Sequence, residues 1–144
     1  MSDKEVKLAN ACPILISEDV KKTVKYYVEK LGFTYAKHYE HIESFAALYR
    51  DSVELVVVQS KFGNVKSNTK RYGAGYDVYI DPDTVKGVDI LYQEFVSKGV
   101  KIFSKPSKTD YGSYEFVLED IDGRLIGIGR IYDYNTFFLD SDRE

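Results

Sequence analysis

The hydrophobic positions in the first half of the chain predict a strand, a helix and three further strands. Residues 11–16 (ACPILI) form a short apolar run typical of a buried strand. Asp19 can then cap a helix that ends at Gly32. Strands are predicted at about 33–39, 44–50 and 53–59, the last being the strongest β signal in the chain. The apolar residues of the helix recur at the spacing of one face: Val20, Val24, Tyr27, Val28 and Leu31.

The second half repeats this order after a polar, glycine-containing stretch at 60–74. Alternation predicts a strand at about 75–80, a helix follows at about 84–98, and Gly99 ends it as Gly32 ended the first. Strands are predicted at about 100–104, 113–119 and 124–131, with Asp122 and Gly123 forming the hairpin turn between the last two. The helix places these residues on its apolar face: Val88, Leu91, Tyr92, Phe95 and Val96.

This duplication predicts an α+β fold in which two βαβββ modules pack side by side and form a curved sheet cleft. We expect one domain over residues 1–144. Module 1 spans 10–59 and module 2 spans 75–131, joined by a linker at 60–74 and followed by a C-terminal tail at 132–144. Each module alone would leave one face of its sheet exposed, so we expect the two modules to share a cleft.

Composition narrows the class of protein. The 144 residues carry a formal net charge of −3, which gives no basic footprint for nucleic acid. The polar start has no apolar segment typical of a signal peptide, and no apolar run approaches the ~18 residues of a membrane span. Cys12 is the one cysteine, which fits a reducing, cytoplasmic location. The 13 tyrosines combine apolar area with a polar tip and suit a cavity or an interface.

Three segments resemble a known superfamily. Residues 11–20 (ACPILISEDV), then Tyr26-Tyr27, then residues 30–33 (KLGF) resemble the opening of bleomycin-resistance-type proteins. Residues 119–123 (EDIDG) resemble the turn before the last strand of that family. The chain is therefore similar, over about residues 10–131, to the vicinal oxygen chelate superfamily of glyoxalases, bleomycin resistance proteins and extradiol dioxygenases. It lies closest to the bleomycin-resistance-like branch.

The resemblance implies four metal-ligand positions, one on each of four strands facing the cleft. By position they fall on Cys12, Glu54, Gly75 or a near neighbour, and Gly127. Glycine offers no ligand side chain, and a thiol with one carboxylate matches no common metal preference. A shift of one or two residues would bring Asp77 or Tyr79 to the third position, but the neighbours of Gly127 are apolar.

We therefore expect no metal, no cofactor and no catalytic residues, which makes a binding protein the leading hypothesis and an enzyme the weaker one. The two histidines, His38 and His41, lie away from the ligand positions and are expected at the surface. Cys12 is expected to act as a small hydrophobic residue.

Alternation along the strands identifies the cleft wall, because residues i and i+2 share a face. Six candidates for ligand binding follow: Glu54, Cys12, Asp77, Tyr79, Val56 and Glu115. The opposite set should pack under the helices: Leu15, Leu55, Val57, Val78, Ile80, Phe116, Leu118, Ile126 and Ile128.

Two questions about the cleft stay open at this stage. Glu54, amid valines and leucine, is either a ligand-binding acid or a remnant of a metal site that is hydrogen-bonded to a tyrosine or water. The apolar cleft positions either bind a ligand or are simply filled as core. Glycines at 75, 127 and 129 favour open space or close backbone approach.

An apolar wall with carboxylates and tyrosine is typical of a site for an organic cation with aromatic or aliphatic parts. The leading hypothesis is a protein that sequesters such a small molecule by stoichiometric binding, as in antibiotic resistance of the bleomycin type. One alternative is a metal-dependent lyase, isomerase or dioxygenase of the same superfamily. Another is a non-catalytic regulatory or interaction domain with a filled cleft. The resemblance implies a homodimer, and no nucleic-acid or membrane partner is expected.

Overall fold

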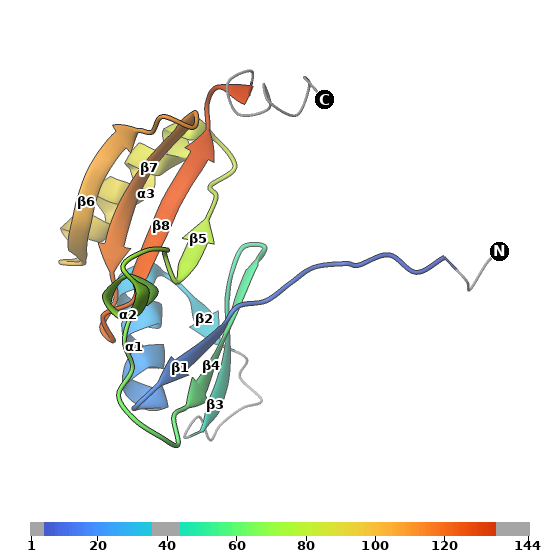
Figure 1. Ribbon diagram of the computed structural model, residues 1–144, viewed down its shortest axis with the longest axis vertical. Coiled ribbons are helices and arrows are strands. Elements are labelled where there is room, and N and C mark those ends of the chain that lie inside the picture. Colours follow the sequence, from blue (N-terminus) through green and yellow to red (C-terminus); the bar gives the residue numbers. More distant parts are fainter. Residues whose placement is uncertain (1–4, 36–43, 135–144) are drawn as a thin grey trace.

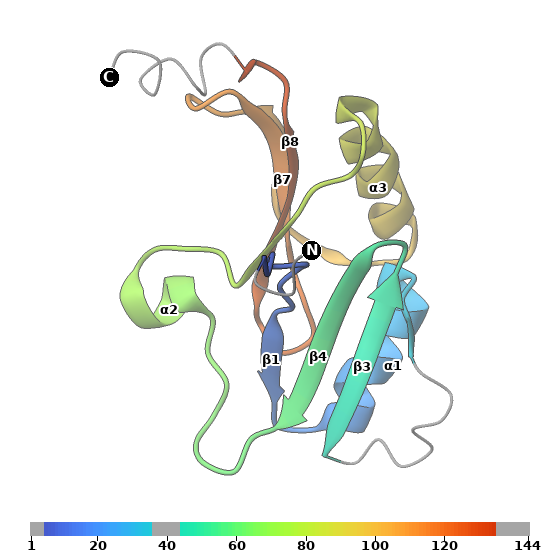
Figure 2. The ribbon, with the colours of Figure 1, turned by 90° about the vertical axis from the view of Figure 1, so that its right-hand side faces the viewer.

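Each half of the chain forms one four-stranded sheet with a helix packed on one face (Figures 1 and 2). The computed structural model describes residues 5–35 and 44–134. The elements of module 1 are β1 (Ile14–Ser17), α1 (Val20–Leu31), β2 (Thr34–Tyr35), β3 (Phe45–Arg50) and β4 (Val53–Gln59). Module 2 and the linker before it contain α2 (Asn68–Tyr72), β5 (Val78–Ile80), α3 (Val85–Ser97), β6 (Lys101–Lys108), β7 (Ser113–Glu119) and β8 (Leu125–Ile131).

The two sheets have equivalent strand orders. Sheet A runs β1-β4-β3-β2 and sheet B runs β5-β8-β7-β6. In each, the first strand pairs in parallel with the last strand of its module, and the other pairs are antiparallel. The α+β fold of two βαβββ modules is therefore confirmed.

The element boundaries differ from the prediction in several places, and β5 begins at Val78 where the prediction began at about residue 75. β1 begins at Ile14 and not at residue 11, because Pro13 has no N–H for the ladder and contributes only its carbonyl, which accepts from Val56 N at 3.0 Å. The linker contains the unpredicted helix α2. β6 reaches Lys108, with register irregularities that suit an edge strand. The strand expected at 33–39 is described only at Thr34–Tyr35, since residues 36–43, with both histidines, lie outside the described part of the chain.

The predicted core face is confirmed. Eight of the nine residues expected under the helices belong to one buried cluster, and Ile80 packs against it. On α1 the predicted apolar face is buried, with Val28 partly so. On α3 the face is narrower than predicted, because Val96 is 44% exposed. The alternation of the strands therefore identified which face of each sheet meets the helices.

A buried polar cluster fixes module 1 to module 2. The hydroxyl of Tyr27 on α1 donates to Asp120 Oδ2 at 2.5 Å, beside the β7–β8 hairpin. Arg124 Nη1 pairs with the same Asp120 oxygen at 3.0 Å and with Asp122 at 2.8 Å. Arg124 also donates to the carbonyl of Ile16 on β1. We call Tyr27, Asp120, Asp122 and Arg124 the intermodule clamp.

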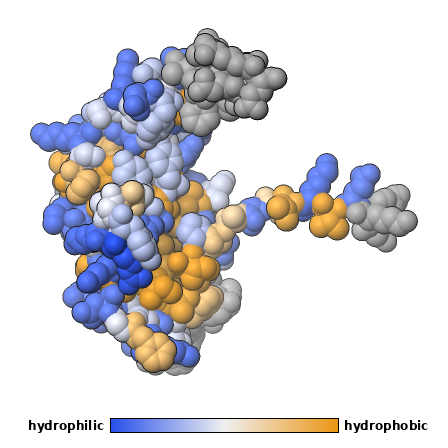
Figure 3. All heavy atoms as spheres, viewed as in Figure 1, coloured by the Kyte–Doolittle hydropathy of each residue, from blue (hydrophilic) through white to orange (hydrophobic). Residues whose placement is uncertain are grey.

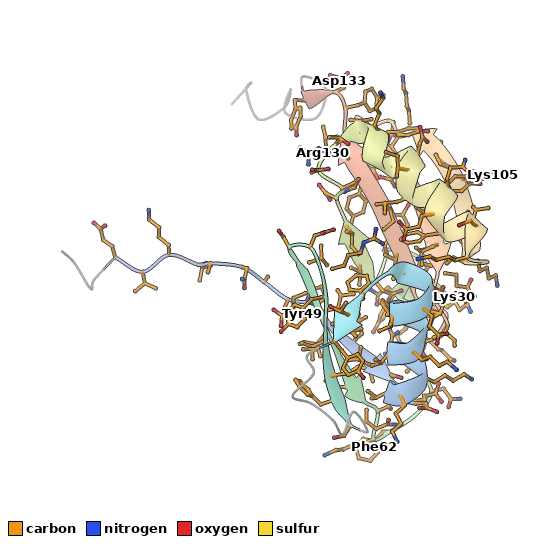
Figure 4. The ribbon with its side chains drawn as sticks, turned by 180° about the vertical axis from the view of Figure 1, so that it is seen from behind. Lys30, Tyr49, Phe62, Lys105, Arg130 and Asp133 are labelled. Carbon is orange, nitrogen blue, oxygen red and sulfur yellow. The ribbon has the colours of Figure 1, made fainter. Side chains whose placement is uncertain are left out.

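A second connection joins the ends of the helices. Arg50 on β3 donates to the carbonyl of Leu31 at 2.7 Å and binds both carboxylate oxygens of Glu94 on α3, at 2.8 and 3.0 Å. Lys30 at the end of α1 donates to the carbonyl of Lys98 at 2.8 Å (Figure 4). These contacts hold the two helices, and therefore the two sheets, in one relative placement. Within the described residues, none of the helices has the length and apolar character needed to cross a membrane.

Candidate functional site

Residues of both modules, with the segment that leads into β1, line an open pocket of about 510 Å³. Its volume lies in the range of small-molecule sites. Three of the six predicted residues line it, namely Cys12, Glu54 and Tyr79. The remaining lining is mostly apolar and is contributed by both modules: Ala11, Pro13, Ser52, Val53, Leu55, Val78, Ile80 and Asp81.

Glu54 is the carboxylate of this pocket. It lies at the start of β4 and is only partly buried, and Tyr49 on β3 donates its hydroxyl to Glu54 Oε2 at 3.0 Å. Tyr49 and Glu54 are register partners across β3 and β4, which explains the contact. Among residues 5–35 and 44–134 the second carboxylate oxygen of Glu54 has no hydrogen-bond donor, so Glu54 can accept a further one.

Cys12 lies next to Glu54 but is poorly suited to react. Its thiol is within 3.4 Å of the Glu54 carbonyl oxygen and 3.5 Å of the Pro13 carbonyl oxygen. Burial raises the pKa of the Cys12 thiol, and the charge of Glu54 raises it further. The thiol is therefore protonated at neutral pH, which makes it a weak nucleophile and a weak metal ligand.

Three of the predicted residues, Asp77, Val56 and Glu115, lie outside the pocket lining. Asp77 accepts the backbone N–H of Asn68 at 2.9 Å with one carboxylate oxygen and that of Leu125 at 2.8 Å with the other. Its carboxylate thus joins the start of α2 to the start of β8. Val56 lies half-buried on the face of sheet A that is turned away from α1.

That face of sheet A, which we call the open face, is apolar. Figure 3 shows hydrophobic side chains gathered over β1 and β4. Ile14 is 56% exposed and Ile16 is 45% exposed. The patch consists of Ile14, Ile16, Phe45, Val56 and Val58, while Ala47 on the same face is buried. Exposed apolar patches of this kind are typical of ligand or protein contacts.

Glu115, the sixth predicted residue, lies under a group of tyrosines on the corresponding face of sheet B. Glu115 is buried and only 5% exposed. Tyr79 and Tyr111 donate their hydroxyls to Glu115 Oε1 at 2.9 and 2.7 Å, and Tyr76 donates to Oε2 at 3.1 Å. The Tyr79 hydroxyl also lies 2.8 Å from that of Ser113. We call Tyr76, Tyr79 and Tyr111 with Glu115 the tyrosine cage.

The glycines of β8 make room for this cage. Sheet B places β8 between β5 and β7, so the side chain of Tyr79 must cross β8 to reach Glu115. A Cβ at Gly127 would lie 2.7 Å from the Tyr76 ring and 2.8 Å from the Tyr79 ring. A Cβ at Gly129 would collide with the Tyr79 hydroxyl and with Glu115 Cβ. Of the two interpretations left open by the sequence, close approach therefore applies to Gly127 and Gly129, and tyrosine rings fill the space above them.

The cage tyrosines are held in the neutral form. Burial raises the pKa of Tyr76, Tyr79 and Tyr111, and the charge of Glu115 and the hydrogen bond to it raise all three further. For Tyr79 the hydrogen bond with Ser113 acts in the opposite direction. The phenols therefore act as hydrogen-bond donors to the carboxylate throughout the physiological pH range.

Sequence reasoning missed Tyr76 and Tyr111. Extending the strand alternation back from β5 put Tyr76 on the core face with Val78, but β5 begins only at Val78, so the alternation does not reach Tyr76. Tyr111 lies in the turn between β6 and β7, where no periodicity applies. The high tyrosine content was the available signal, although it did not specify positions.

The residues at the four implied ligand positions do not fit a metal ion. Gly75 and Gly127 have no donor side chain, and the Tyr76 and Tyr79 rings lie directly above Gly127. Across residues 5–35 and 44–134, no group of three or more histidine, cysteine, aspartate or glutamate side chains could hold an ion. The absence of a metal site therefore stays a prediction. Metal analysis of the purified protein would test it.

A second cavity, of about 540 Å³, adjoins the pocket and shares Ser52, Val53, Ile80 and Asp81 with it. It is bounded by the ends of α1 and β3 and by the first turns of α3. None of the six predicted residues lines this cavity. The pocket at Glu54, and not this cavity, therefore corresponds to the site predicted from the sequence.

Comparison with known proteins agrees with the fold. The model of the "Glyoxalase/Bleomycin resistance protein/Dioxygenase superfamily" matches residues 9–128. No curated protein matches the chain. A glyoxalase/bleomycin resistance protein/dioxygenase from Alicyclobacillus acidocaldarius is 20% identical, with a TM-score of 0.68 over 88% of this chain and 93% of that one.

Two further solved structures show the same fold. The bleomycin-binding protein from bleomycin-producing Streptomyces verticillus, complexed with copper(II)-bleomycin, is 20% identical, with a TM-score of 0.64 over 86% of this chain and 97% of that one. TioX from Micromonospora sp. ML1 is 16% identical, with a TM-score of 0.63 over 85% of this chain and 95% of that one. At these identities the likeness concerns the fold alone.

Proposed function

The chain belongs to the glyoxalase/bleomycin resistance protein/dioxygenase superfamily, and on that premise we propose that it binds a small organic molecule between its two sheets. The binding is stoichiometric, without turnover. The observation that carries this proposal is the pocket of about 510 Å³ in which Glu54 and Tyr79 meet apolar walls from both modules. Apolar walls with a few convergent polar groups are the usual make-up of a small-molecule site.

The chemistry of the pocket favours binding over catalysis. The Cys12 thiol is kept protonated, and the positions at which metal-dependent relatives hold their ion carry two glycines. Glu54 supplies a negative charge and favours a cationic ligand. The bleomycin-binding protein from Streptomyces verticillus supports the idea that this fold can sequester an organic molecule.

A panel of small molecules tests this proposal through ligand-induced shifts in melting temperature, followed by calorimetric titration of each hit. We expect one molecule per site to bind unchanged. We expect Glu54→Gln to weaken a cationic hit by roughly tenfold, the scale of one charge-assisted contact. The matched control is Glu29→Gln, an exposed acid on α1 outside the pocket. Conversion of a hit to product, or stoichiometric metal in protein purified without chelator, would overturn the proposal.

The tyrosine cage supports a second candidate, a regulatory or interaction domain whose cleft is closed to small molecules. In that case the rings above Gly127 and Gly129 serve only to cover the sheet B half of the cleft face. A panel with no hits, together with a melting temperature unchanged by Glu54→Gln, would favour this candidate.

We also propose a homodimer in a reducing cytoplasm. The open face supports the dimer, because Ile14 and Ile16 remain more than two-fifths exposed in the single chain. A second copy covering that face would remove this apolar area from water. The single cysteine is consistent with the reducing location.

A further inference from the structure

Glu115 is a buried acid whose charge lacks a counterion within the part of the chain that the structure describes. In that part, three charged residues are nearly fully buried, namely Glu115, Asp120 and Arg124. Asp120 and Arg124 neutralise each other at 3.0 Å. In contrast, no lysine or arginine among the described residues pairs with Glu115, and its carboxylate accepts from the three tyrosine hydroxyls instead. Buried charges in proteins are normally paired, so Glu115 indicates that a positive charge is supplied from outside the described chain.

The three rings above Glu115 are accessible to such a charge. Tyr76 is 39% exposed, Tyr79 41% and Tyr111 46%, although their hydroxyls converge on one buried carboxylate. Tyr76 and Tyr79 stack with ring centroids 6.4 Å apart and planes 12° apart. A cation over the face of a tyrosine is attracted by the ring electrons, and a hydrogen bond from the phenol to an anion polarises the ring in the favourable direction.

The hydrogen bonding selects the kind of cation. Three hydroxyls already donate to the two oxygens of Glu115, so few of the roughly four lone-pair sites of this carboxylate remain free. A primary ammonium or a guanidinium needs acceptors for its N–H groups and finds few here. A quaternary ammonium has no N–H and needs only ring faces and a nearby negative charge. A metal ion would need to displace the hydroxyls from the carboxylate.

We propose that the tyrosine cage binds the alkylated ammonium head of an organic cation, with Glu115 as the buried counter-charge. This rests on the proposed small-molecule function, and it names the class of ligand. The cage continues into the pocket through Tyr79, which belongs to both. The head of the ligand then lies on the rings, and its remaining part extends along the apolar wall toward Glu54.

The test compares choline with 3,3-dimethyl-1-butanol, which has nearly the same shape but no charge. Binding to the full chain is measured by calorimetry and by broadening of the methyl resonance. We expect choline to bind at least tenfold more tightly than the alcohol. Equal binding of the two probes, or no binding of choline at concentrations where the alcohol binds, would overturn the inference.

Variants then separate the charge from the packing. Glu115→Gln keeps the shape of the side chain and removes its charge, so we expect the preference for choline over the alcohol to disappear. Tyr79→Phe keeps the ring and should retain most of the preference, whereas Tyr79→Leu should abolish choline binding. Tyr72→Phe on α2, which lies outside the cage, is the matched control. A merely structural role for Glu115 would weaken both probes equally and leave their ratio unchanged, which would contradict the inference.

A variant that fails to fold is replaced by a milder one. If circular dichroism shows that Glu115→Gln is unfolded, Tyr111→Phe is used in its place. This variant removes one of the three hydroxyl groups that donate to Glu115, and we expect the preference for choline over the alcohol to fall by a few fold. The two proposals fail separately. Neutral molecules that bind at Glu54 while choline does not bind would leave the small-molecule function standing and overturn the ammonium site.

Discussion

Sheets A and B have the same strand order but differ in the face that each turns away from its helix. On sheet A, Val56 of β4 is paired across to Ile14 of β1, and the face is apolar and open. On sheet B, the equivalent pairing joins Gly127 of β8 to Tyr79 of β5, and aromatic rings cover the strand. The β-branched residues on one central strand and glycines on the other decide whether the face is bare or carries the cage.

This difference gives the two copies of the duplicated module two different surfaces. An open apolar face offers area that is favourable to bury against a ligand or another protein. A face with glycines accepts large side chains laid flat across it, which can orient polar groups over the sheet. The open face of sheet A thus provides an apolar wall, and the tyrosine cage of sheet B provides a buried negative charge.

The largest expected effect comes from filling the space that glycine leaves on sheet B. Gly129→Val places side-chain atoms where the Tyr79 hydroxyl and Glu115 Cβ lie, so we expect the free energy of unfolding to fall by about 1–3 kcal/mol. Urea denaturation measures this change. Val58→Ile on β4 is the matched control on the open face, and we expect it to alter stability by less than about 0.5 kcal/mol. Equal losses in both variants would show that the two faces are packed alike.

A smaller effect is expected at alkaline pH and concerns the covered face. The pKa values of Tyr79 and Tyr111 are raised above the ordinary value of 10.0 by burial and by Glu115. The folded protein therefore keeps these protons above pH 10 while the unfolded chain loses them. The contribution to stability is fully present below about pH 10 and is lost as the pH rises toward the folded-state values. Urea midpoints measured from pH 8 upward should decline more gently for Tyr79→Phe than for the wild type, and identical slopes would contradict this expectation.

The smallest effect on the stability of the chain is expected on the open face. Ile16→Asp changes a strand residue that is 45% exposed, so we expect the free energy of unfolding of the monomer to fall by about 1 kcal/mol or less. If a second copy covers this face, the same variant should convert the dimer to a monomer in sedimentation experiments. Lys21→Asp, on the polar face of α1, is the control for the added charge. A wild-type monomer would exclude the proposed dimer.

Much of the fold could be predicted because its signals are local and repeat. Asp19 caps α1 and accepts from Lys22 N at 3.2 Å, and Gly32 ends that helix in the left-handed conformation. Both are visible in the sequence. Helix α2 was missed although Ser67 and Gly73 cap it in the same way, because its five residues are too few to show an amphipathic period.

The candidate site was predictable only in part, because its residues meet through tertiary structure. Alternation placed Glu54 and Cys12 on one wall, since both lie in or next to strands with a clear period. The convergence of Tyr76 and Tyr111 on Glu115 depends on a turn and a strand end, whose side-chain directions have no period. The role of Gly127 also could not be read from the sequence, because it depends on which ring lies above it.

The intermodule clamp has a consequence for chains made in two pieces. Its bonds link residues of α1 and β1 to residues about a hundred positions later, and none of them involves the linker at 60–74. A cut within the linker removes none of the clamp bonds, so Tyr27 on one half and Arg124 on the other still meet complementary polar groups of the opposite half. The intermodule clamp thus makes the two halves candidates for a split reporter. The pocket is expected to form again when two partner proteins fused to the halves bring them together.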